Sequence, residues 1–266
     1  MKVYMSLALG LALGANAADH GSTYGGSGPY KSYYFEVESL SNHTFYQPLE
    51  SGLKEYGSDL KLPVIVWGNG GCDPWHYVLN IFHSTPKIGL KFRNFLGEIT
   101  SWGSLAIATG AAFTDPETYV DSSNSSGQAT GQNPAALTEA IDWVYENAGK
   151  GDWTHIDKTR IGVWGQSCGG LEAYTAGAHD ERGERDYASL PESTPAWKGS
   201  HTLGHSAAYD LPNAGISGVT ARKIMQWVLR GEDSARSWFV GDEPFQEGYV
   251  NVTYRNLERI QVTPIQ

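Results

Sequence analysis

A serine between two glycines is the first feature of this sequence that points to chemistry. Ser167 lies midway between Gly165 and Gly169, directly after the apolar run 160–164. A Gly-x-Ser-x-Gly string between a strand and a helix is typical of a nucleophile elbow, a strained turn that exposes the serine hydroxyl. The alternative is a Gly-rich turn with a structural role only, because the spacing also arises by chance. The predicted strand–turn–helix context favours Ser167 as a nucleophile.

A serine that attacks a carbonyl carbon needs hydrogen-bond donors for the oxyanion that forms. The amide of Cys168, at the start of the helix expected after the elbow, is the first predicted donor. The second is expected in the Gly-rich segment 68–71, which follows the apolar run 62–67. Asn69 and Gly70 are equal candidates within it. A plain turn at the end of a strand is the alternative for this segment.

A histidine late in the chain is expected to act as the base for the serine. Among the eight histidines, His201 and His205 lie late enough. His205 is the better candidate, because it stands in a loop of small residues just before a predicted helix. The alternative for the pair is a zinc site, since side chains at i and i+4 share one helical face. Gly204 would interrupt such a helix and no glutamate follows His201, so no metal is expected.

The elements that must position these residues alternate between strands and helices, which favours a mostly parallel sheet flanked by helices. Apolar or alternating runs predict strands at 33–37, 62–67, 105–109 and 160–164. A helix is predicted at 134–148, where apolar residues recur on one face after Pro134. Another is predicted at 221–230, with Gly231 as its stop. No linker divides the sequence, so a single α/β domain is expected.

The N-terminus has the pattern of a secretory signal peptide. Lys2 precedes the apolar run 3–13, and Ala17 ends a small-residue A-x-A site. We therefore expect residues 1–17 to be removed and residues 18–266 to form the mature domain. A buried first helix is the alternative.

The rest of the composition agrees with an extracellular glycoprotein. Three Asn-x-Ser/Thr sequons begin at Asn42, Asn124 and Asn251. A formal net charge of −10 has the wrong sign for a nucleic-acid partner. No other segment approaches the roughly 18 apolar residues that a membrane span needs. The sequence does not indicate an oligomeric state.

The two cysteines are placed beside the expected site. Cys72 ends the Gly-rich loop and Cys168 adjoins Ser167. A disulfide between them would join the oxyanion loop to the elbow, and two buried thiols are the alternative.

Several blocks of the sequence resemble fungal secreted α/β-hydrolases, relatives of the cutinase-like and polyester-hydrolase group. The blocks are N-H-T-F-Y-x-P at 42–48, P-V-I-V-W-G-N-G-G-C at 63–72, F-R-N-F-L at 92–96, G-Q-S-C-G-G at 165–170 and G-H at 204–205. The resemblance implies a Ser–His–acid carboxylester hydrolase in which Ser167 and His205 match the nucleophile and base. It implies no metal or organic cofactor.

The sequence departs from the family in the segment after the Gly-rich loop. In the family the W-G-N-G-G-C string leads within a few residues to the helix that carries F-R-N-F-L, whereas here residues 73–90 intervene. We interpret 73–90 as an insertion. A lid over the site is the alternative.

A second departure is the short interval between Ser167 and His205. With a helix expected at 168–178, the remainder fits at most one extra strand, near 197–203, because each parallel pair needs a crossover of about a dozen residues or more. An α/β-hydrolase normally places two further strands and the acid-bearing loop in this interval. We therefore expect missing strands and an unpaired sheet edge.

The acid of the triad is expected to be absent from its usual place. In the family it precedes a G-E-R-D-Y string, and here residues 179–182 run directly into that string at 183–187. Asp180 and Asp186 are the nearest substitutes, with solvated loop charges as the alternative for both. Any activity is therefore expected to be weak.

The sequence thus predicts a secreted serine carboxylester hydrolase that acts on a small-molecule ester or polyester through an acyl-enzyme on Ser167. One alternative is a catalytically inactive extracellular binding protein with the same fold. Another is a defective gene model whose product does not fold stably. The sequence does not indicate which ester is cleaved.

Overall fold

The structure is a computed structural model that describes residues 25–49, 60–70, 89–112, 134–177 and 190–265. Several sequence predictions fall outside these ranges: the signal peptide 1–17, most of the insertion 73–90, Cys72, Asn124, Asp180 and Asp186.

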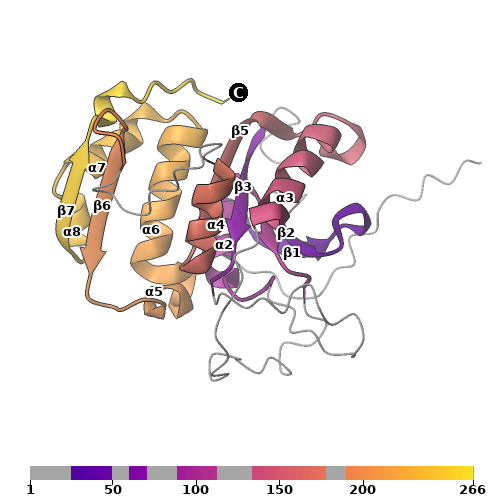
Figure 1. The fold of residues 1–266 in the computed structure, drawn as a ribbon, viewed down its shortest axis with the longest axis horizontal. Coiled ribbons are helices and arrows are strands. Elements are labelled where there is room, and N and C mark those ends of the chain that lie inside the picture. Colours follow the sequence, from indigo (N-terminus) through magenta and orange to yellow (C-terminus); the bar gives the residue numbers. More distant parts are fainter. Residues whose placement is uncertain (1–24, 50–59, 71–88, 113–133, 178–189, 266) are drawn as a thin grey trace, which may run out of the picture.

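A five-stranded sheet forms the centre of the described chain (Figure 1), in the order β1-β2-β4-β3-β5. Its strands are β1 (Ser32–Glu36), β2 (His43–Pro48), β3 (Leu62–Gly68), β4 (Leu105–Thr109) and β5 (Ile156–Gly165). β3 pairs in parallel with both β4 and β5, whereas β1 and β2 extend the sheet in antiparallel fashion. The sheet is therefore mixed with a parallel core, and the four strands expected from the apolar runs are confirmed.

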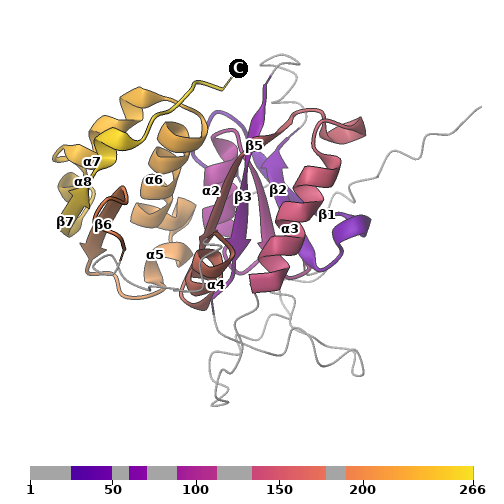
Figure 2. The same ribbon diagram turned by 45° about the horizontal axis from the view of Figure 1, so that its top comes forward.

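Helices cover both faces of this sheet (Figure 2), and the pleat of β3 assigns a different core to each face. Val64 and Val66 point into a cluster with α3 (Pro134–Asn147) and α4 (Cys168–Gly177). Ile65 and Trp67 point the other way, into a cluster with α2 (Arg93–Ser101) and α6 (Gly215–Ile224). β3 is buried along its whole length as a result. The predicted helix 134–148 is confirmed.

The C-terminal part of the chain packs beside this core with an aromatic cluster of its own. Trp227, Trp238, Phe239 and Tyr249 are buried in that cluster. Its elements are β6 (Ala196–His201), α5 (Ala207–Asp210), α6, α7 (Ser237–Val240), α8 (Glu243–Gln246) and β7 (Tyr249–Arg255). α6 continues into a π-helical turn at Met225–Leu229, and Gly231 follows at a positive φ. The predicted helix 221–230 is therefore confirmed and begins earlier than expected.

The strand predicted near 197–203 exists as β6, but it does not join the central sheet. It pairs antiparallel with β7 in a separate two-stranded sheet, which lies beyond α6 in both views (Figures 1 and 2). Trp197 supplies the physical reason, because its ring packs against Trp238, Phe239 and Tyr249 of the C-terminal cluster. The prediction of one further strand near 197–203 was therefore right about the strand and wrong about the sheet that it joins.

β5 ends the central sheet. Among the described strands its only ladder partner is β3. Its residues from Ile161 to Gly165 are all half-buried, in contrast to the fully buried β3. Arg160 secures the start of the strand through hydrogen bonds to the carbonyls of Leu229 (2.9 Å) and Pro264 (3.4 Å). β5 is therefore an edge strand within the described part of the chain.

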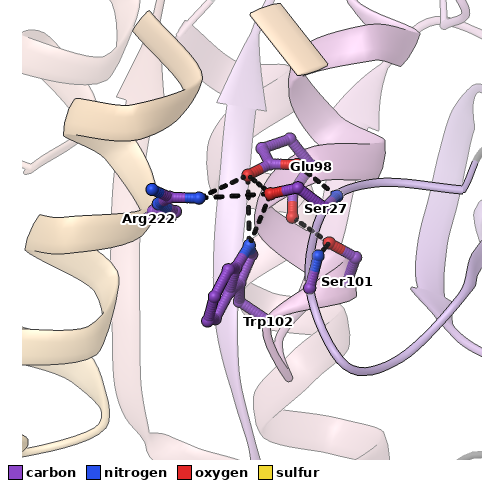
Figure 3. Close-up of polar contacts among 6 residues, drawn as sticks. Ser27, Glu98, Ser101, Trp102 and Arg222 are labelled. Atoms are coloured by element: carbon purple, nitrogen blue, oxygen red, sulfur yellow. Dashed lines mark hydrogen bonds and ion pairs between the residues drawn. The ribbon is translucent and has the colours of Figure 1, made fainter. Parts of the chain in front are cut away.

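The segment 25–30, the first described part of the chain, is held against α2 by the buried carboxylate of Glu98 (Figure 3). Glu98 accepts hydrogen bonds from the backbone amide and hydroxyl of Ser27 at 2.7 and 2.6 Å. The Trp102 indole donates at 3.1 Å, and Arg222 of α6 lies 3.5 Å from the same oxygen. One side chain therefore joins three segments that are far apart in the sequence.

Candidate active site

Ser167 occupies the turn between β5 and α4 with φ of 54°, in the left-handed region. It is exposed, while Gln166 and Cys168 on either side are buried. The flanking glycines explain why the chain can turn here. A Cβ atom at Gly165 would overlap the carbonyl of Gly169, and one at Gly169 would overlap the carbonyl of Gly68 in β3. The turn is therefore packed backbone against backbone, with the serine hydroxyl at its surface.

The turn lies at the carboxyl end of the parallel strands, next to the end of β3. The Gln166 amide donates to the Gly68 carbonyl at 3.2 Å, and the Gly169 amide donates to the Gln166 carbonyl at 2.9 Å. The segment predicted to stabilise an oxyanion begins at Gly68, so the structure brings it beside the elbow. Gly68 and Gly70 are both buried.

The two candidates for the second oxyanion donor differ in their surroundings. The backbone amide of Asn69 donates a hydrogen bond to the Thr109 hydroxyl at 3.3 Å. Its side chain accepts from the Trp67 indole at 2.9 Å and donates to the Thr109 carbonyl. Asn69 is thus committed to joining β3 and β4, which leaves Gly70 as the better placed of the two. The Gly70 carbonyl accepts a hydrogen bond from Lys91 at 3.2 Å.

Cys168 is the first residue of α4, as the elbow pattern predicted for the first oxyanion donor. It is buried and disulfide-bonded, and the described residues contain no free cysteine. Cys72, the other cysteine of the sequence, lies outside the described residues.

His205 stands in the exposed loop between β6 and α5, and its backbone lies beside the elbow. The side-chain amide of Gln166 donates to the His205 carbonyl at 3.2 Å. α5 anchors the other side of the loop, because the Tyr209 ring packs against Trp67, Phe92 and Phe95. The imidazole of His205 and the hydroxyl of Ser167 share no hydrogen bond in the described structure.

His201 lies elsewhere, at the end of β6. Its Nδ1 accepts a hydrogen bond from the Leu203 amide at 3.3 Å, and its ring packs against Tyr249 with centroids 5.9 Å apart. His201 and His205 are not in one helix, since a strand end and a loop carry them. Within the described ranges, no group of three or more His, Cys, Asp or Glu side chains is arranged to hold a metal ion.

Asp180 and Asp186, the predicted substitutes for the acid of the triad, both lie outside the described residues. The described chain does show one elbow residue whose role sequence reasoning missed, Gln166, whose side chain bonds to the His205 loop. No sequence signal could have found this contact, because its partner is a backbone carbonyl far along the chain.

Two sequon asparagines lie in the described chain, and both are exposed. Asn42 precedes β2, and Asn251 lies on β7. No helix in the described ranges is long and apolar enough to cross a membrane.

No protein-family model matches the chain, and no curated protein matches it.

Proposed function

We propose that this protein is a secreted serine carboxylester hydrolase of the α/β-hydrolase type, with Ser167 as its nucleophile. The observation that carries the proposal is the exposed Ser167 at a positive φ, on a close-packed turn between a parallel strand and a helix. Strained non-glycine residues persist where the surrounding structure holds them, and they cluster at functional sites. The resemblance of the surrounding strings to fungal esterases agrees with this assignment.

The proposed reaction uses the groups around the turn. The Ser167 hydroxyl attacks the ester carbonyl carbon while His205 accepts its proton, and the oxyanion that forms is stabilised by the amides of Cys168 and Gly70. His205 then returns the proton to the departing alcohol, which leaves an acyl group on Ser167. Water, activated by His205, releases the acid and restores the serine.

His205 is proposed as the base because Gln166 holds its backbone beside the elbow, whereas His201 packs on Tyr249. The contact with a catalytic serine need not be closed in a free enzyme, since such hydrogen bonds often tighten only in the complex with substrate. Asp180 and Asp186 remain the proposed substitutes for the acid. A bond between Cys168 and Cys72 is proposed as the disulfide that fastens the oxyanion loop.

The test is turnover of a short-chain nitrophenyl ester. We expect slow hydrolysis by the natural sequence, and none above background by Ser167→Ala. Ser193→Ala, which alters an exposed serine in the turn before β6, is the matched control and should keep the full rate. Hydrolysis that survives in Ser167→Ala would overturn the proposal.

The position of the acid is tested by the same assay. Loss of the acid from a serine triad costs about 10⁴-fold in the serine-protease example. Asp180→Asn or Asp186→Asn should therefore slow turnover further if either carboxylate orients His205. Ordinary esterase rates that neither substitution lowers would show that the acid lies elsewhere.

A second candidate is an inactive binding protein with the same fold. The observation in its favour is that the Ser167 hydroxyl and the His205 imidazole share no hydrogen bond in the described structure. Absence of turnover from a cooperatively folded protein would favour this candidate.

Secretion and glycosylation are part of the proposal. The predicted signal peptide and the exposed positions of Asn42 and Asn251 support them. Expression in a eukaryotic secretory host should give a glycosylated protein that begins at Ala18, which mass spectrometry can check.

A further inference from the structure

Gln166 is the residue of the elbow whose side chain reaches away from the turn. It is buried to an exposure of 6% although it precedes the exposed Ser167. A polar side chain so deeply buried costs free energy unless its groups are bonded. Its bonds therefore indicate what the residue does.

The amide nitrogen of the side chain is directed at the histidine loop. Gln166 Nε2 donates to the carbonyl of His205 at 3.2 Å. The loop from residue 202 to residue 207 is otherwise exposed. This hydrogen bond consequently fixes a segment that has little packing of its own.

The amide oxygen of the same side chain lies against the oxyanion segment. A Cβ atom built on Gly70 would overlap Gln166 Oε1, and it would also come within 2.8 Å of the Gln166 carbonyl oxygen. Gly70 thus touches Gln166 with its backbone, and a larger residue there would push the amide aside. One side chain separates the Gly70 backbone from that of His205.

We infer that Gln166 is a positioning residue that sets the distance between the oxyanion segment at Gly70 and the base loop at His205. This inference deepens the proposed function and rests on it for its catalytic consequence. The backbone of Gln166 is itself fixed, by its hydrogen bonds to Gly68 and Gly169. The Gln166 side chain therefore lies between the Gly70 backbone and the His205 backbone, and its own backbone is fixed at the end of β5.

The chain offers a matched control for this residue. Gln47 in β2 is also buried, with an exposure of 8%, and its side chain donates one hydrogen bond, to the Tyr33 hydroxyl at 2.6 Å. Gln47→Leu and Gln166→Leu each replace a buried, hydrogen-bonded amide by an apolar group of similar size. Any general effect of that replacement on stability appears in both variants.

The first measurement does not depend on activity. Hydrogen–deuterium exchange of the full chain should show faster exchange in Gln166→Leu of the hydrogen-bonded amides at the two ends of this loop, those of Leu203 and Tyr209, by about tenfold, the factor for a lost hydrogen bond of about 1.4 kcal/mol. Gln47→Leu should leave both amides unchanged. Unchanged exchange of both amides in Gln166→Leu would overturn the inference, whether or not the protein is an esterase.

The second measurement addresses catalysis through a double-mutant cycle, in which the rate of Ser167 labelling by a fluorophosphonate is compared. Misplacement of a catalytic group by about 1 Å can cost about 100-fold. Gln166→Leu should slow labelling by about 10- to 100-fold when His205 is present, and by a clearly smaller factor in the His205→Ala background, where only its contact with Gly70 can matter. An equal slowing in both backgrounds would show that Gln166 does not act through His205.

The two failures are distinguishable. If the natural sequence is not labelled at all, the proposed function fails, while the exchange measurement still decides whether Gln166 holds the loop. If Ser167 is labelled and the cycle shows no coupling, the proposed function stands and the role of Gln166 falls.

Discussion

Ser167 adopts a left-handed backbone conformation although it carries a Cβ atom. Such a conformation costs an L-residue roughly 1–2 kcal/mol, and glycine pays almost none of it. Gly165 and Gly169 cannot relieve this strain, since each is needed for close backbone packing. The strain is therefore a local cost of presenting the hydroxyl at the surface.

This cost can be measured by comparing two variants that both remove the hydroxyl. We predict that Ser167→Gly is more stable than Ser167→Ala by about 1 kcal/mol, because only glycine escapes the strain. The measurement is the free energy of unfolding in urea. At Thr138, inside α3, the order should reverse, with Gly less stable than Ala by about 1 kcal/mol. If the alanine variant is the more stable one at Ser167 as well as at Thr138, Ser167 is not strained.

His43 predicts how stability depends on pH. Burial lowers the pKa of this histidine, and the hydrogen bond to Ala136 and the charge of Glu139 oppose the shift only in part. His43 Nε2 donates to the Ala136 carbonyl at 2.8 Å, so the buried Nδ1 has no proton and no partner in the described structure. Protonation of His43 would place a charge there with no acceptor.

Because the folded pKa is depressed, the stabilising effect of neutral His43 is complete above the unfolded pKa of about 6.5 and is lost as the pH falls through the folded pKa. We predict that stability decreases from about pH 7 to about pH 5, by up to about 1.4 kcal/mol per pH unit for each such group. His43→Gln keeps a donor for Ala136 and should flatten this decrease. Burial also lowers the pKa of His155, so part of the decrease in stability should remain in the His43→Gln variant. An unchanged slope in His43→Gln would contradict the assignment.

At the scale of elements, Glu98 of α2 links this helix to α6 and to the segment 25–30. Its side chain is 2% exposed and accepts hydrogen bonds from Ser27 and Trp102, with Arg222 beside it (Figure 3). The Arg222 guanidinium also stacks on the Trp102 ring, 4.9 Å from its centroid. Removal of the carboxylate would deprive three donors of their shared acceptor: Ser27, which is exposed, and Trp102 and Arg222, which are half-buried.

We predict that Glu98→Ala lowers the free energy of unfolding by about 2 kcal/mol, the scale of lost hydrogen bonds to a charged group, because Arg222 and Ser27 can still be solvated. Residues 25–30 should also become accessible to protease. Glu232→Ala is the control, because its ion pair with Arg230 involves a carboxylate side chain that is 44% exposed. Such a pair contributes about 0–1 kcal/mol. Equal losses in the two variants would show that the network adds nothing to α2.

The elements that could be predicted from sequence are those in which apolar residues occupy the buried positions. β3 and β4 are buried apolar runs, and α3 begins at a proline and repeats its apolar residues on one face. The apolar run 160–164 predicted only the second half of β5, which begins at Ile156 and includes charged residues in its first half. β2 was missed as a strand, because its buried residues include His43, Thr44 and Gln47. Each of these side chains makes a hydrogen bond that only the fold brings near, such as the one from Thr44 to the Gly110 carbonyl.

The site could be predicted where it depends on local backbone chemistry. The Gly-x-Ser-x-Gly spacing placed Ser167 on a strand–helix turn, and the structure has that turn. The different surroundings of Asn69 and Gly70 could not be predicted from sequence, since the hydrogen bond between Asn69 and Thr109 joins the ends of two strands. The pairing of β6 with β7 was equally hidden, because it depends on aromatic packing between distant segments.

At the scale of the whole molecule, the main liability is the edge of β5, which pairs with β3 alone among the strands that the structure describes. Its first half carries Asp157, Lys158 and Arg160, charges of the kind that discourage edge pairing. The half from Ile161 to Gly165 carries none and is only half-buried. Exposed, uncharged edges are templates for pairing with another chain.

We predict that the protein associates at high concentration through this half of β5. Val163→Lys should reduce the association, which light scattering or gel filtration can measure. Val250→Lys is the comparison, because Val250 is a 63% exposed valine on β7, the other sheet of the molecule. A reduction by Val250→Lys alone would place the association on β7 and contradict the role of the β5 edge.

The central claim, that Ser167 is an activated nucleophile at an assembled site, is tested most directly by labelling with a fluorophosphonate followed by mass spectrometry of the peptides. Labelling requires a nucleophile, a base and an oxyanion site together. The account predicts one modified serine, Ser167, with the label lost in Ser167→Ala and retained in Ser193→Ala. An unmodified Ser167 in a folded protein, or a label that persists in Ser167→Ala, would contradict it.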